Sequence, residues 1–556
     1  MNQPRPTTTD STEEKHEAST PDQAGAIGGT LRTRLLLVVL SLLGATTILI
    51  STSRYGAGIS PDSVAYVSVA RSLVEGRGFV DYHGALLALW PPLYPALLAV
   101  ISLISRLDPL TCAPVVNAVL FAALIGLSGL LFAQYVTRSS ALVLLGAASV
   151  LVSRTLFNSS VSAMSEPLFI CCVLLLLLSA RRYGRDANMA SLMVMSFSAA
   201  AAPLIRYVGL IVIPVGAVMV LSRGRTRPKT RLLHLAGFLC ISTAPLVAWV
   251  MWGYLRTGGP PPLSSDLTYS RSDSFGLVVS TVLGWFAQGS AGRLALIRNA
   301  SFVALASGLA VAGLARLSHK SASGLWLKTK GLLLDVGPLL LFLVLYTLFA
   351  AVSHAALGSA LDDRLLSPVF VPTFVLLFAL LDRSIGILRA GPRRIVRIGL
   401  PATVCIWLLV PAFEVGCDAL TLSRRGAGGF STVEWKESPT INFVEHLAPS
   451  ARAVLYSNAP DALYILRNLE ARWSPRKPPH VLERTIRLRV RYAEPPPERL
   501  KKLEGVWPEQ DGGLLVWFSG VPWRYYLFTP SELGLIAHVD TLAKLDDGTI
   551  YMVSRR

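Results

Sequence analysis

Four charged side chains stand at the edges of long apolar runs, where an ionisable residue is costly and is usually functional or paired. They are Asp62, Glu166, Arg206 and Arg364. A carboxylate can accept the proton of an attacking hydroxyl as a general base. An arginine pair can bind a phosphate and neutralise it as a leaving group. A second carboxylate can stabilise the oxocarbenium character that builds up when a sugar is displaced. These residue types therefore fit the transfer of a sugar from a phosphate-linked donor to a hydroxyl.

Each of these residues also has a structural interpretation that the sequence leaves open. Asp62 and Glu166 can simply cap the N-terminal ends of helices, where a carboxylate is stabilising. Arg206 can extend its guanidinium to the membrane surface. Arg364 can pair with one of the two acids directly before it. That all four fall on one side of the predicted membrane favours a functional interpretation.

Three tyrosines and a histidine extend the candidate site. We expect these four side chains to bind substrate, and they are Tyr66, Tyr94, Tyr207 and His354. All six cysteines lie in or beside apolar runs, so a disulfide framework is not expected. No metal-ligand spacing appears in the sequence. We therefore expect no cofactor and assign no metal ligands.

Composition places the chain among polytopic membrane proteins. Of its 556 residues, 52% are hydrophobic and only 15% are charged, and the mean hydropathy is +0.52. Residues 1–30 are polar and predict a disordered cytoplasmic tail. No cleavable signal sequence precedes the first apolar run, so we expect that run to remain as a helix.

Eleven apolar runs are candidates for membrane crossings. They begin near Leu35, Ala113, Ala141, Val161, Met189, Tyr207, Leu232, Ala300, Leu332, Leu365 and Ile398. The runs from Ala141 and Ala300 are the shortest relative to the ~20 residues that a span needs. Two further runs, 92–104 and 275–287, have the length of interfacial segments and are not counted.

The basic residues fix the expected orientation. They cluster in loops 181–185, 223–231, 316–330 and 383–397, which all lie on one side if the N-terminus is cytoplasmic. The formal net charge of +18 is then a topology signal, and nucleic-acid binding is not expected. With eleven crossings, the C-terminal part lies on the outer face.

The stretch 55–95 follows the first apolar run and holds the candidate base. Ser60 and Pro61 predict a helix start, and Gly76 and Gly78 predict its end. The apolar residues between them share one side, so we expect an amphipathic helix with that side in the bilayer interface. Asp62 stands in the first turn of this helix.

The character of the chain changes after residue 425. Strands are predicted at 453–457, 514–519 and 549–554, and helices at 459–467 and from Pro530. Residues 31–425 are therefore expected to form the transmembrane catalytic domain. Residues 426–556 are expected to form a small extracytoplasmic α/β domain.

The order of these motifs resembles that of a known superfamily. In turn come SPDSVAYVSVARSLVEGRGF, WPPLYP, SEPLF and RY. This order is similar to the GT-C integral-membrane glycosyltransferases, and closest to the protein O-mannosyltransferase and lipid A aminoarabinose transferase group (glycosyltransferase family 39-like). The resemblance covers residues 34–222 and, more weakly, 346–381; it does not extend to the C-terminal domain.

The resemblance implies roles for two acids. Asp62 takes the position of the superfamily's catalytic first-loop aspartate, and Glu166 that of its second outer-loop acid. It also implies an inverting transfer from a polyprenyl-phosphate sugar to an acceptor glycan, lipid or protein in the cell envelope. Many relatives carry paired acids in the first loop, whereas Ser63 follows Asp62 here. This departure puts a divalent-metal site in doubt.

Two other classes of function compete with this interpretation. A transporter or flippase of a lipid-linked glycan would carry charges along several crossings, yet Asp335 is the only acid deep within a run. A membrane-anchored binding protein would rely on its C-terminal domain and would not need so elaborate a first loop. A membrane glycosyltransferase remains the preferred prediction.

Overall fold

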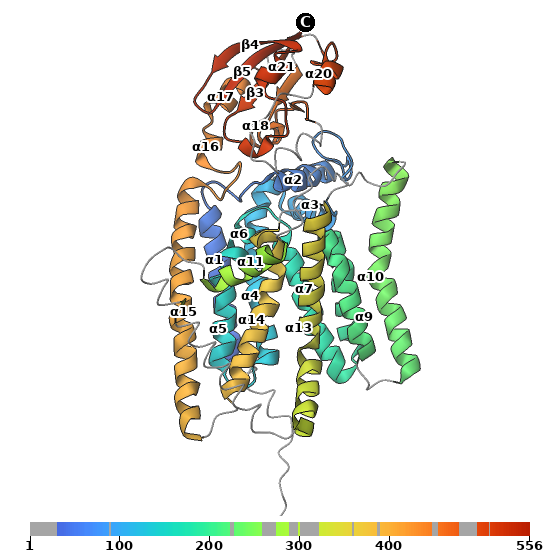
Figure 1. The fold of residues 1–556 in the computed structure, drawn as a ribbon, viewed down its shortest axis with the longest axis vertical. Helices are drawn as coiled ribbons and strands as arrows, with labels where there is room; N and C mark the ends of the chain where they lie inside the picture. Colours follow the sequence, from blue (N-terminus) through green and yellow to red (C-terminus); the bar gives the residue numbers. More distant parts are fainter. Residues whose placement is uncertain are drawn as a thin grey trace, which may run out of the picture.

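The structure is a computed structural model that describes residues 31–87, 90–222, 227–257, 274–287, 299–300, 322–357, 361–385, 390–447, 454–477, 497–510 and 512–556. A helical bundle forms its larger part, and a small α/β unit covers one end of the bundle (Figure 1). Seven of the described helices are long and apolar enough to cross a membrane. They are α1 (Leu31–Thr52), α4 (Pro109–Tyr135), α7 (Glu166–Asp186), α10 (Pro228–Thr257), α13 (Ala322–Leu357), α14 (Asp363–Ile385) and α15 (Ala390–Arg425). The chain is a multi-pass membrane protein.

The remaining apolar runs form shorter helices. The run from Ala141 forms α5 (Ser140–Leu151) and α6 (Arg154–Val161), which meet at a bend of 48° and together can make an eighth span. The runs from Met189 and Tyr207 form α8 (Met189–Ile205) and α9 (Val212–Ser222), and the 3-10 turn η3 (Tyr207–Ile211) precedes α9. The run predicted from Ala300 lies outside the described residues. The two runs not counted as crossings form short helices, α3 (Leu93–Ser105) and α11 (Ser274–Ala287).

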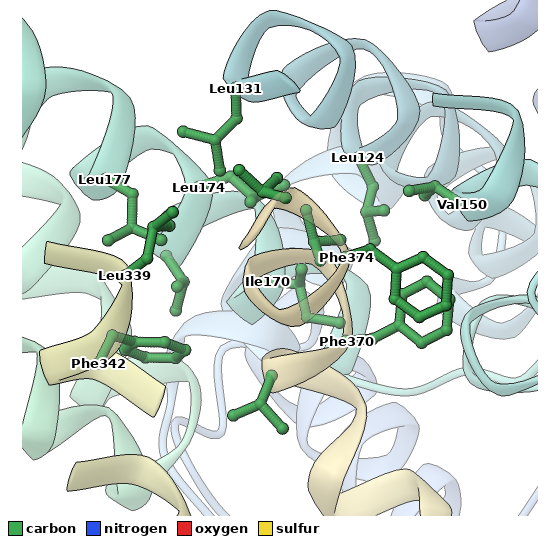
Figure 2. Packing of buried hydrophobic residues seen from close by; sticks show 14 of the residues in the cluster. Leu124, Leu131, Val150, Ile170, Leu174, Leu177, Leu339, Phe342, Phe370 and Phe374 are labelled. Atoms are coloured by element: carbon green, nitrogen blue, oxygen red, sulfur yellow. The ribbon is translucent and has the colours of Figure 1, made fainter. Parts of the chain in front are cut away.

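The centre of the bundle is a continuous apolar core. Side chains from α4, α5, α7, α13 and α14 interdigitate there, as Figure 2 shows, and they include Leu124, Val150, Ile170, Leu174, Leu339, Phe342, Phe370 and Phe374. The Phe370 and Phe374 rings stack with their centroids 4.2 Å apart. Helix association inside a bilayer relies on such close packing, because lipid tails are as apolar as the side chains. The core thereby fixes α7 and α14, which both carry site residues at their first turns.

Helix α2 (Pro61–Val74) begins and ends as predicted. Ser60 is its N-cap, Pro61 its first residue, and Gly76 follows with φ of +77°. The predicted contact of its apolar side with the bilayer interface is wrong. Val64, Val67 and Ala70 are buried in a protein core with residues of the C-terminal unit. Helical periodicity marks a face that must be buried, but it does not identify what covers that face.

The C-terminal unit, residues 426–556, has a five-stranded sheet in the order β2-β1-β3-β5-β4. Its strands are β1 (Val454–Ser457), β2 (Arg472–Trp473), β3 (Gly513–Phe518), β4 (Ala537–Lys544) and β5 (Gly548–Arg555). Strand β1 pairs in parallel with β2 and β3, whereas β5 pairs antiparallel with β3 and β4. The helices are α16 (Val433–Lys436), α17 (Pro439–Leu447), α18 (Pro460–Arg467), α20 (Pro497–Leu503) and α21 (Pro530–Leu533), with the 3-10 turn η4 (Pro522–Arg524). This confirms the predicted α/β unit, although the sequence reading missed β2 and β4.

The C-terminal unit shares a core with the first loop. Val64 and Val67 of α2 belong to one buried cluster with Ile441 of α17, Val516 of β3 and Ile550 of β5. Helices α2 and α3 therefore lie between the bundle and the C-terminal unit (Figure 1). The end of the bundle that carries Asp62 is the end that this unit covers.

Candidate active site

Extended segments on both sides of Gly58 and Ile59 fix the start of α2. The Gly58 N–H donates to the Val161 carbonyl at 2.9 Å, next to the segment that leads into α7. The Ile59 N–H donates to the Gly428 carbonyl at 3.1 Å, and the Ile59 carbonyl accepts from Phe430 at 2.8 Å. Gly429 has φ of +59°, and a side chain there would collide with the Ile59 carbonyl. These bonds hold α2 against both α7 and the C-terminal unit.

Capping of α2 does not depend on Asp62. The Ser60 hydroxyl accepts from the Ser63 N–H at 3.2 Å, and the Ser63 hydroxyl accepts from the Ser60 N–H at 3.1 Å. This reciprocal pair is a capping box, which satisfies the exposed N–H groups of the first turn. The carboxylate of Asp62 is left to interact elsewhere.

The structure brings the four predicted charges into one network. Arg364 Nη2 donates to Asp62 Oδ2 at 2.5 Å, and Arg364 Nε lies 2.7 Å from Glu166 Oε1. Arg206 Nη1 also pairs with Glu166 Oε1. Four separate segments of the protein thus contribute to a series of ion pairs that runs from Asp62 to Arg206. Two positive and two negative charges make the network neutral.

The network has a buried end and an open end. The side chain of Glu166 is 1% exposed and that of Arg206 is 14% exposed, against 27% for Asp62 and 40% for Arg364. The second oxygen of Glu166, Oε2, is buried and has no hydrogen-bond partner in the described part of the chain. A ligand that approaches from the open end meets Asp62 and Arg364 first. It finds an unsatisfied carboxylate oxygen beyond them.

Arg364 does not pair with the acids before it. Asp362 instead caps α14 by accepting from the Leu365 N–H at 2.8 Å. Asp363 accepts from Thr155 Oγ1 and from Trp285 Nε1, both at 2.6 Å. These contacts hold the first turn of α14 against α6 and α11.

A further contact fixes the same turn from α13. The Tyr346 hydroxyl donates to the Leu365 carbonyl at 2.8 Å, and Tyr346 is fully buried. The sequence reading did not identify Tyr346, Thr155 or Trp285, because each lies inside an apolar or neutral segment without a local signal.

Tyr66 and Tyr94 line the buried side of the network. The Tyr66 hydroxyl lies 3.2 Å from the Oγ of Ser165, the residue that precedes Glu166 in the sequence. Burial raises the pKa of Tyr66; Arg206 opposes this shift, and Glu166 and Asp62 add to it. The hydroxyl therefore stays protonated beside the carboxylates.

The ring of Tyr94 packs edge to face on Tyr66, with centroids 5.2 Å apart. Its hydroxyl donates to Asn117 Oδ1 at 3.3 Å, and the residue is fully buried. Tyr94 thus packs against the Tyr66 ring and helps to fix its position.

The two remaining predicted residues are Tyr207, directly after Arg206, and His354 on α13. The Tyr207 hydroxyl accepts from Trp249 Nε1 at 3.4 Å, and Trp249 stacks on Trp252 of the same helix. His354 is buried near the C-terminal end of α13. Tyr207 therefore faces an aromatic pair on α10.

The described residues contain no group of three or more His, Cys, Asp or Glu side chains placed to hold a metal ion. The two acids of the network are instead bridged by Arg364, which contacts both. The arrangement provides positive charge through guanidinium groups.

Comparisons with known proteins bear on the fold. No family model matches the chain, and no curated protein matches it in sequence. The structure is similar to that of ArnT from Cupriavidus metallidurans in the apo state, at 14% identity and a TM-score of 0.57, over 93% of this chain and 97% of that one. The chain has the GT-C fold. The same ArnT bound to undecaprenyl phosphate matches at 13% identity, with the same TM-score and coverage.

The GT-C likeness extends beyond the part that the sequence motifs indicated. It covers 93% of the chain, whereas the motif order stopped near residue 381. An oligosaccharyltransferase from Archaeoglobus fulgidus is more distantly similar, at 12% identity and a TM-score of 0.48, over 94% of this chain and 73% of that one. The likeness to ArnT confirms the GT-C fold predicted from the order of motifs.

Proposed function

We propose that this protein is a membrane glycosyltransferase that moves a sugar from a polyprenyl-phosphate donor to an acceptor hydroxyl. The observation that carries the proposal is the network of Asp62, Glu166, Arg206 and Arg364 at one end of a GT-C bundle. A neutral cluster of two acids and two arginines has the groups that this reaction needs. That the similar ArnT structure is bound to undecaprenyl phosphate supports a lipid phosphate as the ligand.

The arginines bind the donor phosphate. Guanidinium groups match phosphate oxygens with paired hydrogen bonds. Arg364 is paired with Asp62 and Glu166, so a phosphate competes with these carboxylates for it. Asp62 is the more exposed of the two acids and is displaced first, whereas Glu166 keeps its pairing with Arg206.

Displacement frees Asp62 to act as the general base. The acceptor oxygen attacks the anomeric carbon and loses its proton to Asp62 while the bond from that carbon to the phosphate oxygen breaks. The electron pair of this bond leaves with the polyprenyl phosphate, whose charge Arg206 and Arg364 neutralise. Attack opposite the leaving group inverts the anomeric centre.

Glu166 serves this reaction from the buried end. One of its oxygens holds both arginines, and the other has no hydrogen-bond partner among the described residues. In the substrate complex the second oxygen accepts a sugar hydroxyl and faces the developing oxocarbenium charge. Tyr66 and Tyr207, with His354, complete the walls on either side of the donor.

The orientation follows from the basic loops. The N-terminus is cytoplasmic, and the C-terminal unit and the network lie outside the plasma or inner membrane. Residues 31–425 form the catalytic domain and residues 426–556 an extracytoplasmic domain. The acceptor is a glycan, lipid or protein of the cell envelope.

The test is turnover by the purified chain in vesicles. Polyprenyl-phosphate sugars are supplied as a panel with an envelope extract as acceptor, and release of polyprenyl phosphate is followed. Asp62→Asn keeps the shape of the side chain and removes the base, so turnover falls ~10²-fold or more. Since Ser60 and Ser63 cap α2, the variant folds normally, which circular dichroism checks. Near-normal turnover by Asp62→Asn contradicts the proposal.

A further inference from the structure

A large cleft lies at the other end of α2 from Asp62. Its volume is about 1120 Å³, slightly above the usual range of ligand pockets. One wall comes from the ends of α2 and α3 and the start of α4, and the other from α17 and α18 of the C-terminal unit. Arg71 of α2 lies nine residues after Asp62 in the same helix, which is about 13 Å along its axis.

Aromatic contacts join the two walls, and an ion pair lies within each wall. Tyr82 stacks on Tyr464 of α18 with centroids 4.4 Å apart, and the Arg71 guanidinium lies 5.5 Å from the Tyr464 ring. Arg71 also donates to both oxygens of Asp108, at 2.8 and 3.2 Å. On the opposite wall Arg467 pairs with Glu445 at 2.7 Å. The cleft is therefore a preformed site.

Three polar side chains at the rim of the cleft are exposed and open to a ligand. Arg106, Asn468 and Glu470 line it, and none of them makes a side-chain hydrogen bond or ion pair within the described residues. Arg106 and Asn468 end α3 and α18 in the left-handed conformation, with φ of 60° and 54°. A left-handed residue is a common way for a helix to end.

The charge balance of the lining indicates what kind of ligand fits. The cleft is lined by Arg71, Arg77, Arg106 and Arg467 and by Glu75, Asp108, Glu445 and Glu470, so its formal charge is zero. The C-terminal ends of α2, α3 and α18 also meet there, and their last carbonyls are acceptors with partial negative charge. A polyanion or a polycation finds no complementary field. A ligand with many hydroxyls uses both kinds of group, because each hydroxyl donates and accepts.

We infer that this cleft is a binding site for an uncharged oligosaccharide, and that it holds the part of the acceptor distant from the reacting hydroxyl. The inference rests on the proposed function, since it assigns the cleft to the acceptor. Helix α2 joins the two sites: its first turn holds Asp62 and its last turns line the cleft. An acceptor that spans α2 is thereby positioned with its hydroxyl at Asp62.

Apolar residues beside the cleft allow the glycan to be either lipid-linked or free. Leu103 and Leu107 line the cleft and are 59% and 52% exposed, and Ile104 beside them is 75% exposed. A lipid chain attached to the glycan can pack on these residues, whereas a free glycan uses only the polar rim. The chemistry recognised is the same in both cases.

Saturation-transfer NMR on the full chain tests the inference. The protein is placed in phospholipid nanodiscs, because sugar-based detergents would occupy the cleft. Neutral oligosaccharides of glucose, mannose and galactose are the probes, each free and with a single alkyl chain. The double variant Arg106→Asn/Glu470→Gln keeps the left-handed turn and removes both unpaired charges. We expect at least one oligosaccharide to bind, and to bind about tenfold more weakly to this variant.

The control is Arg54→Asn, which removes an exposed arginine that does not line the cleft. It should bind like the parent chain. Tighter binding of the alkyl-linked form identifies a membrane-borne acceptor, and equal binding identifies a soluble one; either supports the site. No binding by any probe, or equal binding by the double variant and the parent, overturns the inference.

This experiment is separate from the test of the proposed function. Glycan binding needs no turnover and should be unchanged in Asp62→Asn. Full turnover by Asp62→Asn with intact glycan binding would reject the catalytic proposal and leave the cleft as a glycan site. The expected loss of turnover in Asp62→Asn, together with no glycan binding by the parent chain, would reject only the glycan site in the cleft.

Discussion

The two ends of α2 carry charge clusters of opposite construction. At the first turn, Asp62 belongs to a network whose members come from α2, α7, α14 and the end of α8, and whose centre is buried. At the last turns, Arg71 pairs with Asp108, which is 40% exposed, and the cluster opens to a wide cleft. The first cluster depends on tertiary structure from distant parts of the chain. The second is built mostly from partly exposed pairs.

This difference separates catalysis from recognition. Removing charges from water is costly unless each is compensated, so the buried network is highly sensitive to the loss of one member. Exposed pairs contribute little to stability and tolerate exchange. The buried end therefore suits a phosphate that must be fixed and neutralised. The open end suits a polyhydroxylated ligand that is held by many weak contacts.

The largest expected effect comes from removing the centre of the buried network. Glu166→Gln leaves Arg206 and Arg364 without their shared counter-charge. We expect a loss of about 3 kcal/mol of stability, since breaking a buried pair leaves an uncompensated charge. The melting temperature in detergent measures it.

The matched control for Glu166→Gln restores neutrality. Glu166→Gln with Arg206→Gln again balances the charges, so most of the stability returns while lipid-phosphate binding stays weak. A single variant as stable as the parent would show that Glu166 is not the centre of the network.

A smaller effect is expected from the residue that positions Arg364. Asp363→Asn loses an acceptor for Thr155 or Trp285, so the first turn of α14 is held less firmly. We expect affinity for polyprenyl phosphate to fall about fivefold, from weakening of one hydrogen bond. Trp285→Phe also removes one of the two bonds, but it leaves no donor facing another donor and should show a smaller loss. An equal loss in the Arg364→Lys background would mean that Asp363 acts independently of Arg364.

The smallest effect is expected at the open end. Arg71→Gln removes the half-exposed pair with Asp108 and the contact with Tyr464. It should cost no more than about 1 kcal/mol, as exposed pairs do. Polyprenyl-phosphate binding should not change. A loss of phosphate binding comparable to that of Arg364→Lys would erase the distinction between the two ends of α2.

The sequence predicted the members of the buried network but not their pairing. Asp62, Glu166, Arg206 and Arg364 are recognisable because each interrupts the edge of an apolar run. The sequence left open a pairing of Arg364 with its neighbouring acids, which instead bind Leu365, Thr155 and Trp285. The true partners lie far away in sequence. Only the docking of α2 through Gly58 and Ile59 brings them together.

The same limit applies to the surroundings of α2 and to the sheet. Periodicity gave the limits of α2 correctly, yet its apolar side packs on the C-terminal unit rather than on lipid. Strand β2 has two residues and is defined only by its pairing with β1. Strand β4 is half exposed and lacks a strong apolar pattern. Neither has a local signal strong enough to predict.

The central claim is that a lipid phosphate displaces Asp62 from Arg364. Binding of polyprenyl phosphate, without a sugar, to the purified chain tests it most directly. Asp62→Asn removes the competitor for Arg364, so it should bind the phosphate at least as tightly as the parent while its turnover is lost. Arg364→Lys loses the paired hydrogen bonds and should bind about tenfold more weakly. A parallel loss of phosphate binding and turnover in Asp62→Asn would contradict the account.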